Sequence, residues 1–120
     1  MEILHDKARI VQELVPGKQI TLAHIIANPD EVLYQKLGLD TSIDYTSSAI
    51  GILTVSPAET AIICGDIAIK SSGAELGFVD RFSGSLIITG TVSSVEESLR
   101  AICAYCKEKL GYTVCEITKT

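Results

Sequence analysis

Four cysteines are the first residues of this chain whose type and spacing could support chemistry. Cys103 and Cys106 form a C-x-x-C pair, a spacing found in zinc sites and in thiol redox centres. A zinc site needs a second pair at similar spacing, which Cys64 and Cys115 do not supply. The C-x-x-C also falls inside a predicted helix, away from the helix start where the dipole would acidify a thiol. We therefore interpret these thiols as buried apolar side chains in a reduced protein.

The other candidates for chemistry are single residues without catalytic partners. His24 lies in an apolar run, and no nucleophile with a carboxylate stands at motif spacing from it, so we interpret it as a packing or interface residue. Asp66 falls in the middle of a predicted helix, where a subunit or solvent contact is favoured over catalysis. Arg81, beside Asp80 at a predicted turn, either binds an anion or forms a plain turn pair. With no glycine-rich phosphate loop present, the residues predict no enzyme, no cofactor and no metal site.

Three segments carry the start signals of helices. The first begins at an Asn28 cap, with Pro29 at the first helical position. The second begins at a capping box over residues 56–59, and the third begins near residues 93–97. In the third, the apolar residues recur on one face, as in an amphipathic helix. Each segment ends at a glycine that can close a helix: Gly38, Gly73 and Gly111.

Runs rich in β-branched residues between these helices predict strands, since each run is bounded by Gly, Pro, Ser or Asp. The runs cover residues 19–27, 49–55, 74–79, 85–92 and 112–117. Residues 79–84 are typical of a tight turn, so the strands on either side form a hairpin. Helices that cover one sheet face predict an α/β sandwich of two layers. Over residues 49–117 the element order is that of a ferredoxin-like domain.

Composition limits the class of protein. The 120 residues suit one domain, and 47% hydrophobic residues with 21% charged residues are too apolar for disorder. A net charge of −5 without a basic patch disfavours nucleic acid, and no apolar run approaches the ~20 residues of a membrane helix. The first residues lack the pattern of a signal peptide, so a cytosolic protein is expected. A chain this small, with only six aromatic residues to build a bulky core, is expected to bury apolar surface between subunits.

Three stretches carry a resemblance to a known family. They are VPGKQITLAHIIANP at 15–29, AIGILTVSPAE at 49–59 with GDIAIK at 65–70, and GFVDRFSG at 77–84. Together they resemble the circularly permuted bacterial microcompartment (BMC) shell proteins of the EutS (ethanolamine utilisation) and PduU (propanediol utilisation) types. The similarity runs from about Arg9 to the last residue.

The resemblance implies a structural protein of a bacterial microcompartment in the cytoplasm. Members form homohexameric tiles that pack with other shell proteins around metabolic enzymes, with no cofactor and with neither nucleic acid nor membrane as partner. Residues 16–120 would be the permuted BMC domain, in which the strand and short helix over 19–37 come first instead of last. The resemblance leaves open whether ethanolamine, propanediol or choline utilisation is enclosed.

The resemblance also assigns residues to the edges of the tile. Lys70 matches the lysine that meets its counterpart across the junction between tiles, and Asp66 matches an acidic position that serves subunit contacts. Asn28 and Pro29 stand where unpermuted relatives carry an edge loop with an arginine, which is absent here.

Two further segments of the chain correspond to features on the six-fold axis of the tile. The loop at the axis corresponds to Arg81, Phe82, Ser83 and Gly84, and the bulk of Phe82 implies a narrow opening. Residues 1–15 would be an arm whose strand joins its symmetry mates in a small parallel barrel over the axis, which leaves no strand edge exposed. A disordered arm is the alternative. The residues of the barrel strand would be Ile10, Val11, Gln12, Glu13, Leu14 and Val15.

Two other function classes compete with the shell protein. One is an oligomeric ferredoxin-like sensor or regulator that binds a small molecule between subunits, since fold alone does not decide function. The other is an enzyme that uses Cys103, Cys106 or His24. Hexamers that tile favour the shell protein, whereas discrete trimers with ligand-dependent stability favour the sensor.

Overall fold

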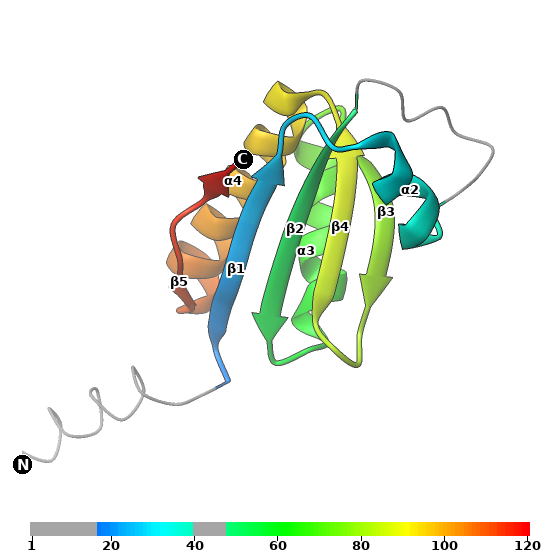
Figure 1. Cartoon of the computed structure of the whole chain (residues 1–120). Coiled ribbons are helices and arrows are strands. Elements are labelled where there is room, and N and C mark those ends of the chain that lie inside the picture. Colours follow the sequence, from blue (N-terminus) through cyan, green and yellow to red (C-terminus); the bar gives the residue numbers. More distant parts are fainter. Residues whose placement is uncertain (1–16, 40–47) are drawn as a thin grey trace, which may run out of the picture.

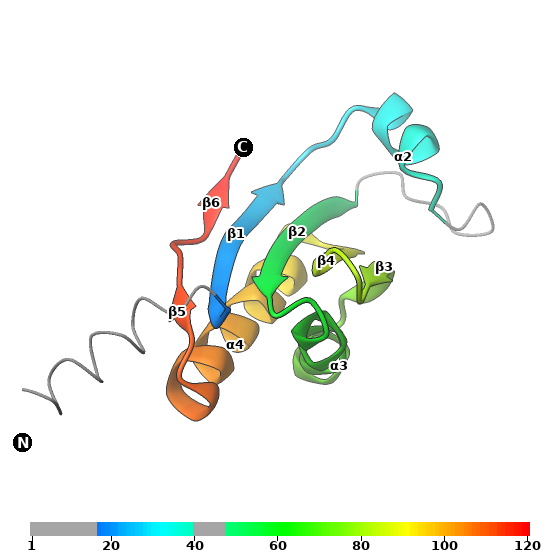
Figure 2. The same cartoon turned by 90° about the horizontal axis from the view of Figure 1, so that it is seen from below.

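The computed structural model describes residues 17–39 and 48–120, and in them two helices cover one face of a mixed sheet (Figure 1). Viewed from below, α3 and α4 lie side by side on the same side of the strands, while α2 stands apart from them (Figure 2). The predicted two-layer α/β architecture is confirmed. The elements in chain order are β1 (Gln19–Ile26), α2 (Glu31–Leu37), β2 (Ala49–Ser56), α3 (Thr60–Ser71), β3 (Glu75–Asp80), β4 (Ser85–Gly90), α4 (Val92–Leu110), β5 (Thr113–Val114) and β6 (Thr118–Lys119).

Strand β1 lies inside the sheet although it comes first in the described chain. The strand order is β3-β4-β2-β1-β5, and β6 also pairs with β1. Strand β1 is antiparallel to β2, with Ile25 opposite Gly51, and parallel to β5 and β6. In a plain ferredoxin-like domain the last strand would lie beside the first strand of the motif, which here is β2. Here β1 takes that place, and the C-terminal strands lie outside it.

The prediction of one continuous strand over residues 112–117 is wrong, because this segment contains a break. Two pairs of residues, in β5 and β6, join β1 in one common register, and the three residues between them leave the ladder. The interruption lies beside an irregularity in β1 between Ile20 and Leu22, where the pairing of β1 with β2 also shifts. An irregular strand cannot present an evenly spaced row of backbone N–H and C=O groups to its neighbour.

All three predicted helix starts are displaced. Helix α2 is capped by Asp30, whose Oδ1 accepts a hydrogen bond from the Val32 amide at 3.0 Å, so Asn28 is not the cap and Pro29 precedes the helix. Helix α3 begins at Thr60 without a side-chain cap, because residues 57–59 form a turn instead of the predicted capping box.

The start of α4 is also displaced, because the helix begins at Val92, before the predicted start near residues 93–97. Thr91 is the cap, and its hydroxyl accepts a hydrogen bond from the Ser94 amide at 3.1 Å. At the other end, Gly111 adopts the left-handed conformation with φ 73°, and Gly38 does the same after α2. These two glycines confirm two of the three predicted stop signals. The third is wrong, because α3 ends at Ser71 with Ser72 as its extended C-cap, so Gly73 does not close the helix.

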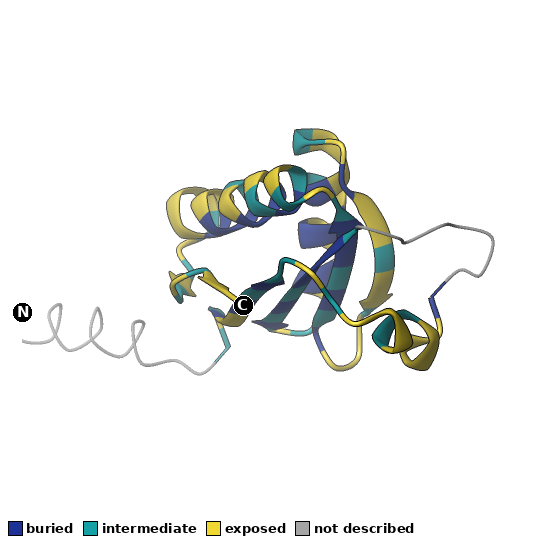
Figure 3. Cartoon of the chain, turned by 45° about the horizontal axis from the view of Figure 1, so that its top comes forward, coloured by how far each residue is buried: buried dark blue, intermediate teal, exposed yellow. Residues whose placement is uncertain are grey.

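The hydrophobic core lies between the sheet and the two long helices (Figure 3). Helix α4 packs directly on β2 at Gly51, because this residue has no side chain. A Cβ at Gly51 would lie 2.7 Å from Cγ1 of Val95 and 2.8 Å from Cγ1 of Ile88. The fully buried large apolar residues between sheet and helices include Ile25, Leu53, Leu86, Ile88, Val95, Leu99 and Ile102.

His24 joins the C-terminal residues to β1. Its Nδ1 lies 2.6 Å from the Thr118 hydroxyl, and its Nε2 lies 2.9 Å from the Thr120 hydroxyl. The Thr120 amide donates to the Ile25 carbonyl at 2.8 Å, and the Ala27 amide donates to the Thr120 carbonyl at 3.0 Å. Both ring nitrogens are thus used in holding the end of the chain against the sheet.

Adding one methyl group at Gly51 will destabilise the fold. We expect Gly51→Ala to lower the free energy of unfolding by about 1–3 kcal/mol, because the new Cβ overpacks the contact between β2 and α4. Urea denaturation followed by circular dichroism measures the change. The matched control is Gly73→Ala, where a Cβ meets nothing within 4 Å. Equal midpoints for the two variants would contradict this account of the core.

Candidate functional site

The hairpin between β3 and β4 is a closed and well-bonded turn. The Gly84 amide donates to the Asp80 carbonyl at 2.9 Å. The Asp80 carboxylate accepts from the Phe82 amide at 2.8 Å and from the Ser83 hydroxyl at 2.9 Å. These bonds, the Phe82 amide first, lower the pKa of Asp80 below its ordinary value. The predicted hairpin over residues 79–84 is confirmed.

A glycine is required at position 84 because the turn brings its backbone against the backbone of Val55 in β2. Its φ is +77°, which favours glycine, and a Cβ there would lie 2.1 Å from the Val55 carbonyl oxygen. The Val55 amide in turn donates to the Gly84 carbonyl at 2.9 Å. The hairpin is therefore fastened to the end of β2.

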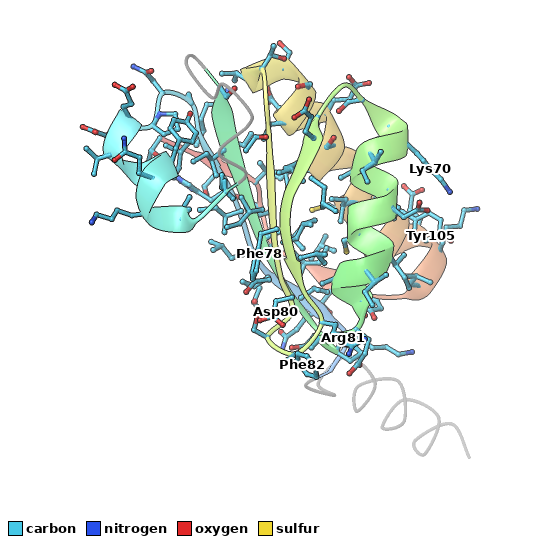
Figure 4. The ribbon with its side chains drawn as sticks, turned by 90° about the vertical axis from the view of Figure 1, so that its right-hand side faces the viewer. Lys70, Phe78, Asp80, Arg81, Phe82 and Tyr105 are labelled. Atoms are coloured by element: carbon cyan, nitrogen blue, oxygen red, sulfur yellow. The ribbon has the colours of Figure 1, made fainter. Side chains whose placement is uncertain are left out.

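Arg81 and Phe82 project from the tip of this hairpin (Figure 4). The Arg81 guanidinium lies over the Phe82 ring, 5.0 Å from the ring centre, a cation–π contact. The Asp80 carboxylate is bonded within the turn, so the plain Arg81–Asp80 turn pair is not formed. Phe82 is 80% exposed. The tip borders a hollow of about 300 Å³, lined by Arg81, Phe82, Asp80, Val79 and Ile62.

The outer face of α3 carries the second group of predicted site residues. Lys70 Nζ lies 2.8 Å from Asp66 Oδ2, one helical turn away, and both side chains are mostly exposed. The hydrogen bond from Lys70 to Asp66, followed by the carboxylate charge, raises the pKa of Lys70. The ammonium group is thus charged and held at the end of the helix that lies far from the hairpin tip (Figure 4).

Sequence reasoning missed the apolar residues on this same exposed face. Ile62, Ile63 and Ile69 of α3 are all exposed, by 53%, 45% and 52%. Ala61, Cys64 and Ala68 on the other side of the helix are buried in the core. The sequence of α3 is apolar on nearly all sides of the helix, which is typical of a helix covered on more than one side and could have indicated this exposed face.

The remaining predicted residues lie apart from these two surfaces or outside the described part of the chain. Asn28 and Pro29 lie in the connection from β1 to α2, with Asn28 exposed. The barrel strand predicted for residues 10–15, and the whole arm over 1–15, lie outside the described residues.

Across residues 17–39 and 48–120, no group of three or more His, Cys, Asp or Glu side chains could hold a metal ion. All four cysteines are free thiols; Cys64, Cys103 and Cys106 are buried and Cys115 is partly so. Over the same residues, no helix has the length and apolar character to cross a membrane. The arrangement in hand consists of a protruding hairpin, a charged pair and an exposed apolar helix face, which are features of contact surfaces.

A protein-family model of the BMC domain matches residues 49–118, from β2 to the start of β6. The chain therefore belongs to the BMC domain family, and its homologues are named bacterial microcompartment shell proteins.

Individual relatives match over nearly the whole chain. The shell protein EutS of Escherichia coli (strain K12) is 50% identical over 115 residues, 96% of this chain and 99% of that protein. The shell protein PduU of Salmonella typhimurium (strain LT2) is 51% identical over 112 residues, 93% of either chain. A solved structure of CutR as a flat hexamer superposes with a TM-score of 0.80 at 46% identity, covering 87% of this chain and 92% of that chain. The resemblance expected from the sequence is confirmed.

The charge of Asp80 will stabilise the hairpin in a pH-dependent way. Because the folded pKa is lowered, this stabilisation is present above the unfolded pKa of about 3.9 and is lost as pH falls through the folded pKa. The variant Asp80→Asn keeps a turn-forming side chain without the charge. We expect the stability difference between wild type and Asp80→Asn to shrink as urea melts are moved from pH 6 to pH 3.

The exposed Glu108 on α4 offers a control for the loss of one negative charge. Glu108→Gln removes one negative charge without affecting a turn, so its urea melts measure the general effect of net charge on stability. A stability difference for Asp80→Asn that stays constant across the pH series would contradict the role of the Asp80 carboxylate.

Proposed function

We propose that this chain is a homohexameric tile of a bacterial microcompartment shell, an assembly protein with no reaction of its own. The observation that carries the proposal is identity of about 50% to named shell proteins over nearly the full length of both chains. The likeness in fold to CutR in a hexamer supports the same assembly. The tile would pack with other shell proteins around metabolic enzymes, with no cofactor, nucleic acid or membrane involved.

A circular permutation of the BMC domain accounts for the place of β1. The family model begins at β2, yet the sheet neighbour of β2 is β1, which lies before the matched residues. Moving the chain ends would leave such a strand in its place in the sheet while changing its place in the sequence. Domain ends commonly lie at the surface and close together, which makes the change tolerable. The permuted domain would comprise residues 16–120, preceded by an arm over residues 1–15.

The hairpin tip would lie at the six-fold axis of the tile. A ring of heterologous contacts closes on itself, so one protruding loop per subunit meets its copies at the axis. Arg81, Phe82, Ser83 and Gly84 would line this opening, and the exposed Phe82 ring would narrow it. The turn is suited to this place because Asp80 and Gly84 hold it closed in the isolated subunit.

The end of α3 would lie at the junction between tiles. Asp66 keeps the Lys70 ammonium charged and in one place, so that it can donate to the neighbouring tile, and Asp66 would serve the subunit contacts. The exposed isoleucines of α3 would supply apolar area to contacts between copies. Asn28 and Pro29 would form the second edge element. Each contact can be weak because it is repeated throughout a sheet of tiles.

The sensor alternative has no support in the comparisons, since the relatives named are shell proteins. Light scattering on the purified chain tests the proposal directly. A mass of six chains, with hexagonal sheets in electron micrographs at high concentration, supports the tile. A monomer at all concentrations, or turnover of a metabolite by the isolated chain, would contradict it.

Removing the charge of Lys70 will separate tile formation from sheet formation. We expect Lys70→Ala to form hexamers of unchanged stability, since its ion pair with Asp66 is exposed, but to form fewer sheets. Light scattering measures the hexamer, and electron microscopy measures the sheets. Lys107→Ala, at an exposed position on α4, is the matched control and should form sheets as the wild type does. Sheets of normal extent from Lys70→Ala would remove Lys70 from the edge.

Residues 10–15 would form the barrel strand over the axis, made of Ile10, Val11, Gln12, Glu13, Leu14 and Val15. We therefore expect the chain that lacks residues 1–15 to stay folded and hexameric and to lose density over one end of the axis in electron micrographs. Loss of soluble protein on deletion would assign the arm to the core instead.

A further inference from the structure

The four cysteines play no part in the proposed tile, yet the fold brings them near one another. Cys64 lies on α3, Cys103 and Cys106 lie on α4, and Cys115 follows β5. The thiols are close enough to influence one another's ionisation. Burial, followed by the charges of Cys115 and Cys106, raises the pKa of Cys103 to about 11. The sequence alone did not indicate this grouping, because the four positions come from separate segments of the chain.

Cys64 and Cys106 face each other across the contact between α3 and α4. On one side of the pair, the Ser98 hydroxyl of α4 donates to the Ala68 carbonyl of α3 at 3.0 Å. On the other side, the hydroxyl of Thr60, the first residue of α3, lies 2.6 Å from the hydroxyl of Tyr112, just beyond α4. These two contacts bring the antiparallel helices together at both ends of the pair. Both cysteine side chains are fully buried between them.

The two thiols are hydrogen-bonded to each other. The contact with Cys106 raises the pKa of Cys64, and the contact with Cys64 lowers the pKa of Cys106. A thiolate is the reactive form of cysteine toward oxidants. The pair therefore contains a thiol that ionises more readily and, in contact with it, a second thiol that can resolve its oxidised form.

We propose that Cys64 and Cys106 form a redox pair that a peroxide converts into a disulfide joining α3 to α4. The Cys106 thiolate, having lost its proton to solvent, attacks one oxygen of hydrogen peroxide. The O–O bond breaks, and the leaving hydroxide takes the Cys64 proton to form water. The Cys64 thiolate attacks the Cys106 sulfenic sulfur, the S–O bond breaks, and the second hydroxide takes a proton from solvent. Two thiols lose two electrons, and one peroxide becomes two waters.

The disulfide would join two elements that lie far apart in the chain. A cross-link of this kind restricts the unfolded chain and so stabilises the folded one. Helix α3 also carries Asp66 and Lys70, so the bond would hold this helix firmly against α4. Because the thiols are buried, the reaction depends on local opening of the helix contact, and we expect it to be slower than the oxidation of an exposed thiol.

The test uses the purified full chain, reduced and then treated with hydrogen peroxide. After removal of the oxidant, the chain is denatured, alkylated with N-ethylmaleimide and analysed by intact mass and by peptide mapping. We expect two of the four thiols to be lost, a linked Cys64–Cys106 peptide in the monomeric chain, a raised Tm and full reversal by dithiothreitol. A cross-link between Cys103 and Cys115, only sulfinic or sulfonic products, or four free thiols after prolonged treatment would overturn the proposal.

Variants separate the pair from the other two thiols. Cys106→Ser and Cys64→Ala should each lose the cross-link and the rise in Tm, whereas Cys103→Ser should keep both. A cross-link that persists in Cys106→Ser would also overturn the assignment. The peptide map of the wild type decides the question even if one of these variants fails to fold. None of these outcomes depends on the oligomeric state, so the proposal can fail while the shell tile stands.

Discussion

The fold depends on β1 lying between β2 and the C-terminal strands. This strand is antiparallel to β2 along its whole length and supplies Ile20, Ala23 and Ile25 to the core. It also provides the ladder on which β5 and β6 pair, and His24 binds the last residues of the chain. Without β1, the edge of β2 would be open and the end of the chain would have no partner. One strand from the beginning of the domain thus closes a sheet that the family model describes from β2 onward.

The two apolar sides of helix α3 impose a second constraint, which connects packing in the core to the association of subunits. Helix α3 is built of small residues on its inner side, so it sits close to the sheet and to α4. Its outer side is also apolar, apart from the Asp66–Lys70 pair. A helix with two apolar sides cannot bury both within a two-layer domain, because one side faces the sheet and no further layer covers the other. Association with further copies covers such a surface, and this agrees with the hexamer of the relative CutR.

The close contact of α3 with α4 explains both the packing and the thiol pair. Small side chains let the helices approach until hydroxyl and thiol groups meet across the contact, with Ser98 bonding to the Ala68 carbonyl. Among the described residues, no buried polar side-chain atom lacks a hydrogen-bond partner. Free cysteines fit such a contact because they pack as small apolar groups. The same closeness places two sulfur atoms where they can react with each other.

The two-layer class, the hairpin at Asp80–Gly84 and the family could be predicted from the residues, since local spacing, glycines and long motifs carry that information. The glycines that end α2 and α4 could also be predicted, because helix termination at a left-handed glycine is a local interaction. The pairing partners of β1, the division of the last strand into two and the contact of Cys64 with Cys106 could not be predicted in this way. Each of these depends on which distant segments pair or pack. Pairing between distant segments leaves no periodic signal in one chain, so that part had to come from the folded molecule.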